Sequence, residues 1–224
     1  MADEQASRPG SVLDRLYAQG QIVSDANGIT HSLFPLSITR TEGEALREWV
    51  KREGAVRTIE TGFAYGISAL FICDGLSAGG NADAIHVACD PNQTDYFGDC
   101  GLQVLAEAGV EDLVEFHPEP SEILLPRLLS EGRSFDLGFI DGNHRFEGVF
   151  LDLIYLGRLV RNGGIVFVDD YQLPAIAKAV GFCTTNLGWE LVEVSADDDL
   201  HQWAVVRTPT EEPWTRAFDS FEDF

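Results

Sequence analysis

Residues 58–68, with the sequence TIETGFAYGIS, decide how the rest of the chain is read. A β-branched run ends in an acid, Glu60, and passes through a turn of small residues toward a helix. Gly62 lets the chain turn off a strand at little steric cost, and Gly66 lets the helix begin close to a ligand, where free backbone N–H groups donate. The stretch therefore predicts a nucleotide-type cradle between a strand and a helix.

The spacing of the two glycines separates this cradle from two common phosphate-binding loops. A P-loop needs Gly-Lys-Ser/Thr, and the dinucleotide fingerprint needs G-x-G-x-x-G. Gly62 and Gly66 instead have the spacing G-x-x-x-G, with an acid just before the turn. We therefore expect a cationic or hydroxyl-bearing ligand.

Composition limits the classes of partner. The 224 residues fit one domain, or a domain with a small N-terminal cap, and the 45% hydrophobic content is enough for a sizeable core. The formal net charge of −22 repels phosphate backbones, so we expect no nucleic-acid partner. Residues 1–5 are polar and no apolar run approaches membrane-spanning length, so we expect no membrane partner and a cytoplasmic protein.

The cysteines show no metal or disulfide pattern. Cys73, Cys89, Cys100 and Cys183 have neither C-x-x-C spacing nor a regular framework. We expect buried free thiols and no structural zinc site.

From residue 56 onward, apolar runs alternate with amphipathic stretches, a pattern typical of βαβ units and a mainly parallel sheet. Strands are expected near 56–61, 84–90, 113–117, 135–141, 164–169, 189–195 and 201–208. Helices are expected at 67–78, 99–109, 121–131, 146–161 and 174–186. Only residues 196–199 join the last two strands, so these strands should form an antiparallel hairpin.

Before the cradle, the sequence predicts helices and an arm. A helix is expected around 41–53, with Thr41 and Glu44 as a capping box. Residues 12–36 are expected to form a short helix and an irregular arm.

In three later segments, an acid again stands at the end of a predicted strand. The strand at 84–90 ends in Asp90, which Pro91 follows. The strand at 135–141 ends in Asp141 and continues as Gly-Asn-His. An Arg-Asn-Gly-Gly segment precedes the strand that ends in Asp169 and Asp170.

With the cradle, this ordered set resembles class I S-adenosylmethionine (SAM)-dependent methyltransferases, from about Ile38 onward. The resemblance implies an α/β, Rossmann-like fold, in which a seven-stranded, mainly parallel sheet has one antiparallel strand and helices on both faces. It divides the chain into an N-terminal helical arm or cap at 1–36, a SAM-binding methyltransferase domain at 37–208 and an acidic tail at 209–224. Aromatic residues on the tail favour docking, for example onto a second copy in a homodimer: Trp214, Phe218, Phe221 and Phe224.

The resemblance also implies contacts with SAM. Glu60 would meet the methionine ammonium, Ser68 the methionine carboxylate and Asp90 the ribose hydroxyls. Ser121 matches an adenine-contacting serine. The full set implied for the cofactor is Ile38, Thr39, Glu60, Thr61, Gly62, Ala64, Tyr65, Ser68, Asp90, Pro91, Ser121 and Asp141.

Acids at the strand ends also predict a metal site. In an open parallel sheet, ligands bind at the carboxyl ends of the strands, and crowded carboxylates are costly unless a cation offsets them. Oxygen ligands from Asp141, Asp169 and Asp170 suit Mg²⁺ or another divalent ion. The arrangement resembles metal-dependent O-methyltransferases of catechols and caffeoyl esters, which have an Asp-Asn pair where this chain has Asp169-Asp170.

His144 stands three residues after Asp141, where that family has a lysine base. An imidazole with an ordinary pKa near 6.5 can serve as a general base at neutral pH. Related methyltransferases of antibiotic sugars also combine a metal and a histidine, so the resemblance makes an alcohol or sugar hydroxyl as plausible an acceptor as a phenol. The implied reaction is methyl transfer from SAM to a hydroxyl of a small molecule, with Asp141 and His144 as catalytic residues.

Each of these residues also has a plainer interpretation. An Asp at a strand end usually forms a turn, Asp169 suits a capping role, and His144 suits the start of the following helix. Three other functions stay open: a metal-independent N- or C-methyltransferase, a non-catalytic SAM-binding subunit, and a nucleotide-dependent dehydrogenase. The missing G-x-G-x-x-G disfavours the last.

Overall fold

The computed structural model describes residues 8–196, 201–210, 217 and 219–224. Four parts of the sequence interpretation fall outside these residues: the polar start at 1–5, the acidic loop residues 197–199, Trp214 and Phe218. The α-helices of the described chain are α1 (Arg8–Gln19), α2 (Arg40–Arg52), α3 (Ile67–Gly79), α4 (Cys100–Ala108), α5 (Ser121–Ser130), α6 (Phe146–Leu159) and α7 (Pro174–Asn186). A short 3-10 helix, η1, covers Glu111–Leu113.

Two sheets contain the strands of the described chain. β1 (Gln21–Val23) and β2 (Thr30–Ser32) form a small antiparallel hairpin. The large sheet has the order β5-β4-β3-β6-β7-β9-β8. Its strands are β3 (Arg57–Thr61), β4 (Ile85–Cys89), β5 (Val114–His117), β6 (Phe135–Ile140), β7 (Val160–Val168), β8 (Glu190–Val194) and β9 (Ala204–Arg207).

The directions of the strands confirm the predicted fold class. β3 pairs parallel with β6, β6 with β7, and β4 with β5. β9 runs antiparallel to both β7 and β8, so it is the reversed strand of the seven. The predicted antiparallel hairpin at the end of the sheet is confirmed.

The chain forms two compact units. The first comprises Met1–Val56 and Phe63–Pro118, and the second comprises Arg57–Gly62 and Glu119–Phe224. The chain therefore passes from the second unit to the first inside the cradle, after Gly62. The division at residues 36 and 208 inferred from the sequence stays a prediction.

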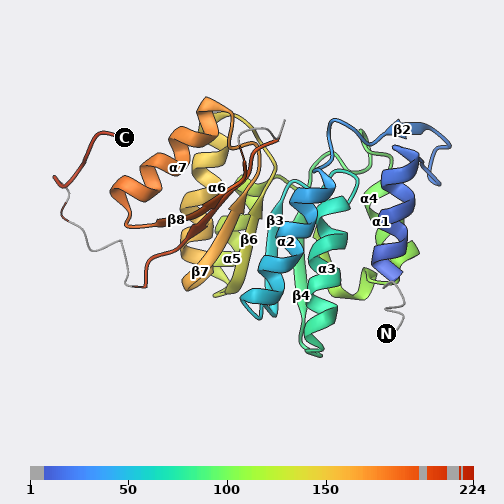
Figure 1. Cartoon of the computed structure of the whole chain (residues 1–224), viewed down its shortest axis with the longest axis horizontal. Helices are drawn as coiled ribbons and strands as arrows, with labels where there is room; N and C mark the ends of the chain where they lie inside the picture. Colours follow the sequence, from blue (N-terminus) through green and yellow to red (C-terminus); the bar gives the residue numbers. More distant parts are fainter. Residues whose placement is uncertain (1–7, 197–200, 211–216, 218) are drawn as a thin grey trace. The chain divides into compact units, whose positions relative to one another are not determined.

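In the first unit, α2 and α3 pack side by side, as Figure 1 shows. Two glycines let them approach closely. A Cβ at Gly43 would lie 2.1 Å from the Phe71 ring, and one at Gly75 would lie 2.9 Å from Val50. Larger side chains at these positions would push the helices apart.

Helix α2 corrects one prediction. The capping box of Thr41 and Glu44 is wrong, because the helix begins at Arg40 and Thr39 is its N-cap. Thr39 Oγ1 accepts a hydrogen bond from the backbone N–H of Glu42 at 3.2 Å. The spacing S/T-x-x-E occurs twice in this segment, and the structure uses the earlier pair, whose Glu42 is buried.

Two further corrections concern segment ends. The arm predicted to be irregular contains the β1–β2 hairpin. Helix α6 ends at Leu159 rather than at 161, because Val160 is extended and pairs with Phe135 of β6. The register between β6 and β7 then shifts before Leu137 pairs with Ile165.

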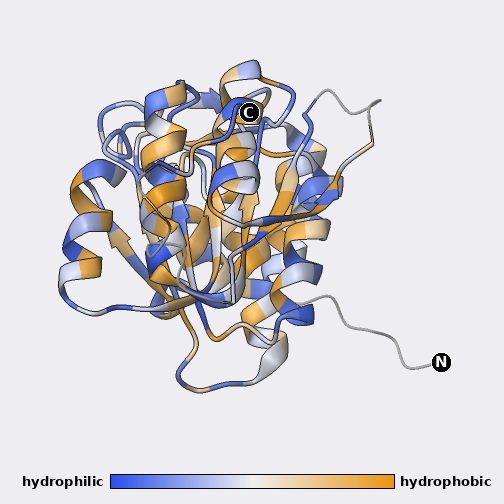
Figure 2. Cartoon of the chain, turned by 90° about the vertical axis from the view of Figure 1, so that its left-hand side faces the viewer, coloured by the Kyte–Doolittle hydropathy of each residue, from blue (hydrophilic) through white to orange (hydrophobic). Residues whose placement is uncertain are grey.

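In the second unit, aromatic and β-branched side chains form the core around the sheet. Phe139 and Phe167 lie on adjacent strands with ring centroids 5.7 Å apart, and Trp203 stacks on Phe167. The strands are mostly hydrophobic, whereas the helices alternate between hydrophobic and hydrophilic residues (Figure 2). A sheet covered on both faces requires this pattern.

The remaining features of the fold are the C-terminal tail and the four cysteines. Phe221 and Phe224 of the tail pack around Phe182 of α7 in the same chain. All four cysteines are free and buried, as predicted. None of the described helices is both long and apolar enough to span a membrane.

Candidate functional site

The cradle is held by a carboxylate in the first unit. Asp90, which follows β4, is 5% exposed. Its Oδ2 accepts the backbone N–H groups of Phe63 at 3.3 Å and Ala64 at 2.8 Å, and its Oδ1 accepts that of Asn92 at 2.8 Å. Asp90 therefore fixes the loop, and because a carboxylate offers about four acceptor positions, it keeps room for hydroxyl donors.

A second side chain holds the same loop, and the sequence interpretation missed it. Gln93 is 1% exposed. Its amide donates to the Ala64 carbonyl at 2.7 Å and accepts the Gly101 N–H at 3.0 Å. The available signal was weak, since only its position three residues after Asp90 marks it out.

The backbone of the cradle needs the residues found there. Gly62 has φ +88° and Gly66 has φ +72°, both in the left-handed region. A Cβ at Gly62 would lie 2.0 Å from the carbonyl oxygen of Asp141. Gly66 is the N-cap of α3, and no side chain of the described residues caps the helix. The first N–H groups of α3 therefore have no partners inside the helix.

The other predicted cofactor residues of the first unit are buried. Tyr65 and Ser68 are 4% and 5% exposed, and Tyr65 packs against Phe97 and His31. The Ile38 carbonyl accepts from the Tyr17 hydroxyl, while the Thr39 side chain caps α2. Pro91 follows Asp90 at the exposed start of the next loop.

In the second unit, Glu60 and Thr61 are buried at the end of β3. The Thr61 carbonyl accepts the Asp141 N–H at 2.9 Å, which ties the end of β3 to the end of β6. The Thr61 hydroxyl donates to Asp152 Oδ2 at 2.8 Å. Asp141 therefore starts from a backbone position that Thr61 fixes.

Asp152 of α6 was also missed from the sequence. It is 1% exposed, and burial raises its pKa to about 6, although hydrogen bonds from Ser121 and Thr61 oppose this. The signal was present, because Asp152 lies on the helix face formed by Val149, Leu153 and Leu156. An acid on an apolar face is unusual.

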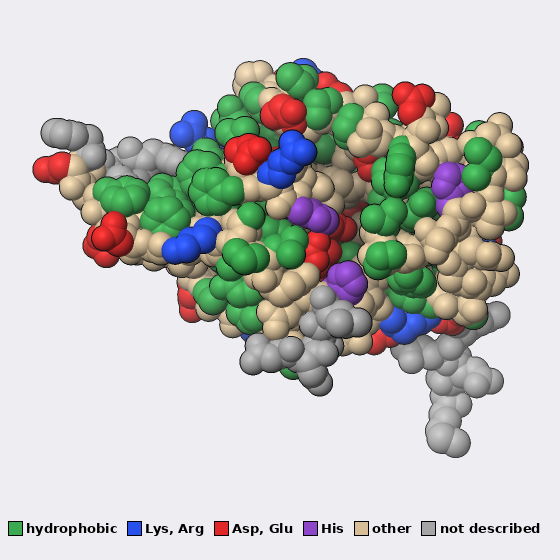
Figure 3. All heavy atoms as spheres, turned by 90° about the horizontal axis from the view of Figure 1, so that it is seen from above, with side chains coloured by type: hydrophobic (Ala, Val, Ile, Leu, Met, Phe, Trp, Pro, Cys, Tyr) green, Lys and Arg blue, Asp and Glu red, His purple; other side chains and the backbone are tan. Residues whose placement is uncertain are grey.

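Asp141, His144 and Asp170 offer ligand atoms that all lie within 4.8 Å of one another. His144 Nε2 lies 3.4 Å from Asp141 Oδ1, and Nδ1 lies 3.1 Å from Asp170 Oδ2. His201 approaches the same Asp170 at 3.7 Å. We call the first three residues the Asp-His cluster; histidine side chains lie beside acidic ones at the surface in Figure 3.

The membership of the cluster differs from the predicted metal triad of Asp141, Asp169 and Asp170. His144 is in the group, whereas Asp169 Oδ1 accepts the backbone N–H of Asp170 at 2.6 Å. Asp169 stays close, since a side-chain hydrogen bond with it lowers the pKa of Asp141. Asp170 has φ +54°, a conformation that Asp tolerates and that the strand pattern does not reveal.

The pKa values within the cluster are linked. Burial raises the pKa of Asp141, with His144 opposing that shift. The hydrogen bond to Asp141 raises the pKa of His144, and the charges of Asp141, Asp170 and Asp169 add to it. Two carboxylates and an imidazole form a donor set that fits a divalent cation.

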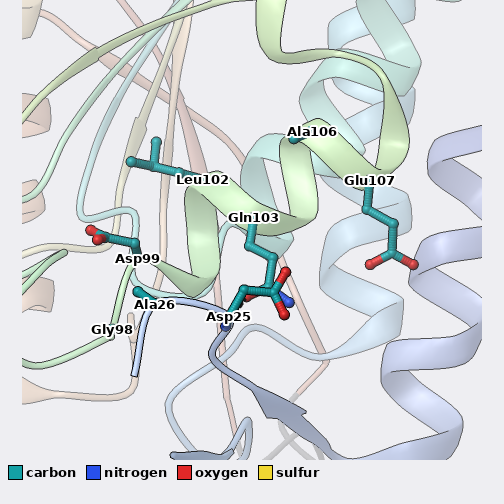
Figure 4. A pocket seen from close by; sticks show the side chains of 8 residues that line it. All are labelled: Asp25, Ala26, Gly98, Asp99, Leu102, Gln103, Ala106 and Glu107. Carbon is teal, nitrogen blue, oxygen red and sulfur yellow. Dashed lines mark hydrogen bonds between the residues drawn. The ribbon is translucent and has the colours of Figure 1, made fainter. Parts of the chain in front are cut away.

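A hollow lies elsewhere in the first unit. The groove has a volume of about 600 Å³. Its lining residues, drawn in Figure 4, are Asp25, Ala26, Gly98, Asp99, Leu102, Gln103, Ala106 and Glu107. Gln103 Oε1 accepts the Asp25 N–H at 2.9 Å within it. None of the predicted site residues lines this groove, and its carboxylates make it unsuitable for an anion.

Residues 59–171 match a protein family described as a methyltransferase domain. Tricin synthase 2 from Oryza sativa subsp. japonica is 32% identical over 144 residues, which cover 62% of this chain and 46% of that protein. Caffeoyl-CoA O-methyltransferase 1 from Eucalyptus globulus is 28% identical over 150 residues, covering 62% and 58%. The chain thus spans about half the length of the relatives it matches.

Solved structures agree on the fold. An O-methyltransferase from Bacillus cereus in complex with S-adenosylhomocysteine (SAH) has a TM-score of 0.71 and 16% identity, covering 88% of this chain and 90% of that chain. The O-methyltransferase TomG from Streptomyces achromogenes, in complex with SAM, has a TM-score of 0.67 and 20% identity, covering 93% and 91%. These likenesses confirm the Rossmann-like architecture.

Proposed function

The chain belongs to the methyltransferase-domain family, and from this premise we propose that it transfers a methyl group from SAM to a hydroxyl of a small molecule. The names of its relatives, a tricin synthase and caffeoyl-CoA O-methyltransferases, support transfer to oxygen. They also favour a phenol as the acceptor, with a sugar hydroxyl as the alternative.

The observation that carries the choice of oxygen is the Asp-His cluster. A neutral hydroxyl is a poor nucleophile until a base removes its proton. His144 has a side chain that is 45% exposed, so an acceptor can reach it, and two carboxylates flank its ring. An amine acceptor would need no such arrangement once it is unprotonated.

We propose a divalent cation as a cofactor, with Mg²⁺ as the first candidate, held by Asp141 and Asp170. When bound, such an ion supplies positive charge that lowers the pKa values of an acceptor hydroxyl and of His144. The imidazole beside the carboxylates also suits Mn²⁺ and other first-row ions, so the identity of the ion is part of the test.

His144 acts as the general base in this proposal. The ring takes the proton of the acceptor hydroxyl, and Asp141 and Asp170 stabilise the imidazolium that forms. Asp141 has a second role, because its backbone is tied to Thr61 at the end of β3. Alignment of the acceptor oxygen with the methyl group supplies much of the rate.

The cofactor contacts are proposals for each unit separately. In the first unit, Asp90 binds the ribose, the backbone of Ala64 contacts the methionyl part, and the start of α3 at Ser68 meets its carboxylate; the exposed N–H groups of a helix start favour an anion there. In the second unit, Glu60 meets the ammonium and Ser121 meets the adenine.

The proposal also includes the cellular location and the oligomeric state of the protein. The four free, buried cysteines fit a reducing compartment, so we propose a cytoplasmic location. A homodimer is retained as a proposal.

Incubation with SAM labelled in its methyl group tests this function. The acceptor panel contains catechols, caffeoyl esters, sugars and primary amines, each with Mg²⁺, with Mn²⁺ or with a chelator. We expect label on an oxygen acceptor, lost with the chelator. Label only on amines, or transfer that the chelator leaves unchanged, contradicts the proposed use of the cluster.

A further inference from the structure

Asp152 is a buried acid that has no part in the reaction proposed above. It lies on α6 and is 1% exposed, on a helix face that is otherwise apolar. Its Oδ2 accepts the Thr61 hydroxyl at 2.8 Å, which joins α6 to the end of β3. An ionised carboxylate only accepts hydrogen bonds, so the single hydroxyl proton of Thr61 points at Asp152 and fixes the rotamer of the Thr61 side chain.

Thr61 is in turn tied to the Asp-His cluster. Its carbonyl accepts the backbone N–H of Asp141 at 2.9 Å. The ends of β3 and β6 approach so closely that a Cβ at Gly62 would lie 2.0 Å from the Asp141 carbonyl oxygen and 2.8 Å from the Gly142 Cα. Segments packed this tightly transmit a shift rather than absorb it. A displacement of Thr61 is therefore passed on to Asp141.

The same face of α6 also supports the loop that carries His144. Gly148 stands one helical turn before Asp152, so the two residues lie one above the other on the helix. A Cβ at Gly148 would lie 2.6 Å from the side chain of Asn143, the residue before His144. The hydrogen bond between Thr61 and Asp152 therefore holds the helix against which this loop packs.

The stability of the fold does not explain an acid at this position. Burial raises the pKa of Asp152 to about 6, so at neutral pH the interior holds the ionised form at a cost in stability. An apolar side chain would avoid this cost. A residue that lowers stability while it makes a defined hydrogen bond next to a candidate site is expected to serve that site.

We propose that Asp152 is a positioning residue for the Asp-His cluster: it holds Thr61, and through the Thr61 carbonyl it fixes where the Asp141 carboxylate is presented to a metal ion. The inference rests on the proposed function, in which Asp141 and Asp170 hold a divalent cation. Asp152 itself touches no ligand. Loss of a partner that orients the ligands of a metal commonly costs about 10- to 100-fold in metal affinity.

The test measures the affinity of Mn²⁺ for metal-stripped protein by calorimetry, with the metal alone as the probe. Asp152→Ala removes the acceptor and should weaken Mn²⁺ binding by at least about tenfold. Asp152→Asn also removes the charge but keeps an oxygen that accepts the Thr61 hydroxyl, so its affinity should stay within about threefold of wild type. The difference between the two variants separates the hydrogen bond from the charge.

Thr61→Val tests the other partner of the hydrogen bond without opening a cavity. It removes the hydroxyl and keeps the shape of the side chain, so Mn²⁺ binding should again weaken by at least about tenfold. If one hydrogen bond carries the effect, the double variant with Asp152→Ala should bind Mn²⁺ no more weakly than the weaker single variant. Additive losses would show that the two residues act separately and would overturn the inference.

Leu153→Ala is the matched control. Leu153 is fully buried next to Asp152 on α6, so this variant opens a cavity in the same helix face and keeps the hydrogen bond to Thr61 in place. Thermal unfolding should occur at a lower temperature, whereas the Mn²⁺ affinity should stay within about threefold of wild type. If Leu153→Ala weakens Mn²⁺ binding as much as Asp152→Ala does, general loosening of α6 explains the result and the inference is overturned.

Different results overturn the inference and the function beneath it. Wild-type protein that binds no Mn²⁺ overturns the proposed metal centre, and the role of Asp152 with it. Equal Mn²⁺ affinities in wild type, Asp152→Ala and Thr61→Val overturn only the role given to Asp152. A loss in Asp152→Asn as large as that in Asp152→Ala does the same, because the charge alone would then account for it.

Discussion

The cradle and the Asp-His cluster are built in different ways. In the cradle, Asp90 and Gln93 are almost completely buried and bind backbone atoms, so the loop has one shape. In the cluster, side chains meet side chains, and the His144 side chain is 45% exposed. The contrast indicates that the cradle sets where a ligand lies, whereas the cluster can exchange protons or bind an ion.

The largest expected effect tests the claim that the Asp-His cluster exchanges protons. His144→Gln should lower kcat for methyl transfer by about 10²- to 10⁴-fold, the usual contribution of a general base, with little change in SAH affinity. Steady-state kinetics and calorimetry measure the two quantities. His201→Gln is the matched control, since His201 approaches Asp170 less closely, at 3.7 Å, and its loss should cost less than about tenfold. Equal losses in both variants would remove the special role of His144.

The next largest effect tests the claim that the cradle loop has one shape. Gly62→Ala should lower the free energy of unfolding by more than about 3 kcal/mol, because the new Cβ meets the Asp141 carbonyl and the backbone has φ +88°. Gly132→Ala has φ +71° but open space around it, so it measures the conformational cost alone, about 1–2 kcal/mol. Denaturant unfolding of both variants gives the difference. Similar values would show that the backbone yields to the added methyl group.

The buried acid Asp152 of the second unit should give the stability a pH dependence. The pKa of Asp152 is raised by burial from 3.8 to about 6 in the folded protein. An acid whose pKa is higher in the folded protein binds its proton more tightly there. Its contribution to the free energy of unfolding is therefore complete below the unfolded pKa and is lost as the pH rises through about 6. The loss is at most ~3 kcal/mol.

The Asp152→Asn variant has no carboxyl at this position, so it lacks this pH-dependent contribution to stability. Between about pH 4 and pH 7, the unfolding free energy of the variant should therefore rise relative to that of wild type by up to ~3 kcal/mol. Denaturant unfolding across that range measures the difference. Parallel curves for the two proteins would show that Asp152 titrates alike in both states.

The smallest effect tests whether the Asp90 carboxylate holds the cradle loop in its shape. Asp90→Asn should cost ~1–3 kcal/mol of stability, because the amide nitrogen cannot accept the backbone N–H groups that the carboxylate accepts. Asp95→Asn, at an exposed position of the same loop, should change stability by less than about 0.5 kcal/mol. Thermal or denaturant unfolding separates the two. A silent Asp90→Asn would mean that the loop does not depend on its carboxylate.

The cradle could be predicted because its signals are local. Gly62, Gly66 and the strand before them lie within one short stretch, and left-handed backbone at the two glycines follows from their type. The alternation of apolar runs likewise predicted the strands of the large sheet, whose ends moved by only a few residues. The exception is β7, whose start at Val160 depends on pairing with Phe135.

What could not be predicted depends on contacts between distant residues. Thr61 and Asp152 meet across 91 positions in the chain. The meeting of His144 with Asp141 and Asp170, and the left-handed backbone of Asp170, are visible only once the chain is folded. The capping of α2 shows a different limit, because two overlapping S/T-x-x-E patterns compete and the sequence does not choose between them.

Calorimetric titration of SAH into metal-stripped protein tests the central claim most directly, repeated with Mg²⁺ or Mn²⁺ and with Asp170→Ala. The account predicts SAH binding in both proteins, and a separate heat of metal binding that Asp170→Ala abolishes. Absence of SAH binding to the wild-type protein would contradict the account as a whole, and SAH binding with an unchanged metal heat in Asp170→Ala would contradict the role of the Asp-His cluster.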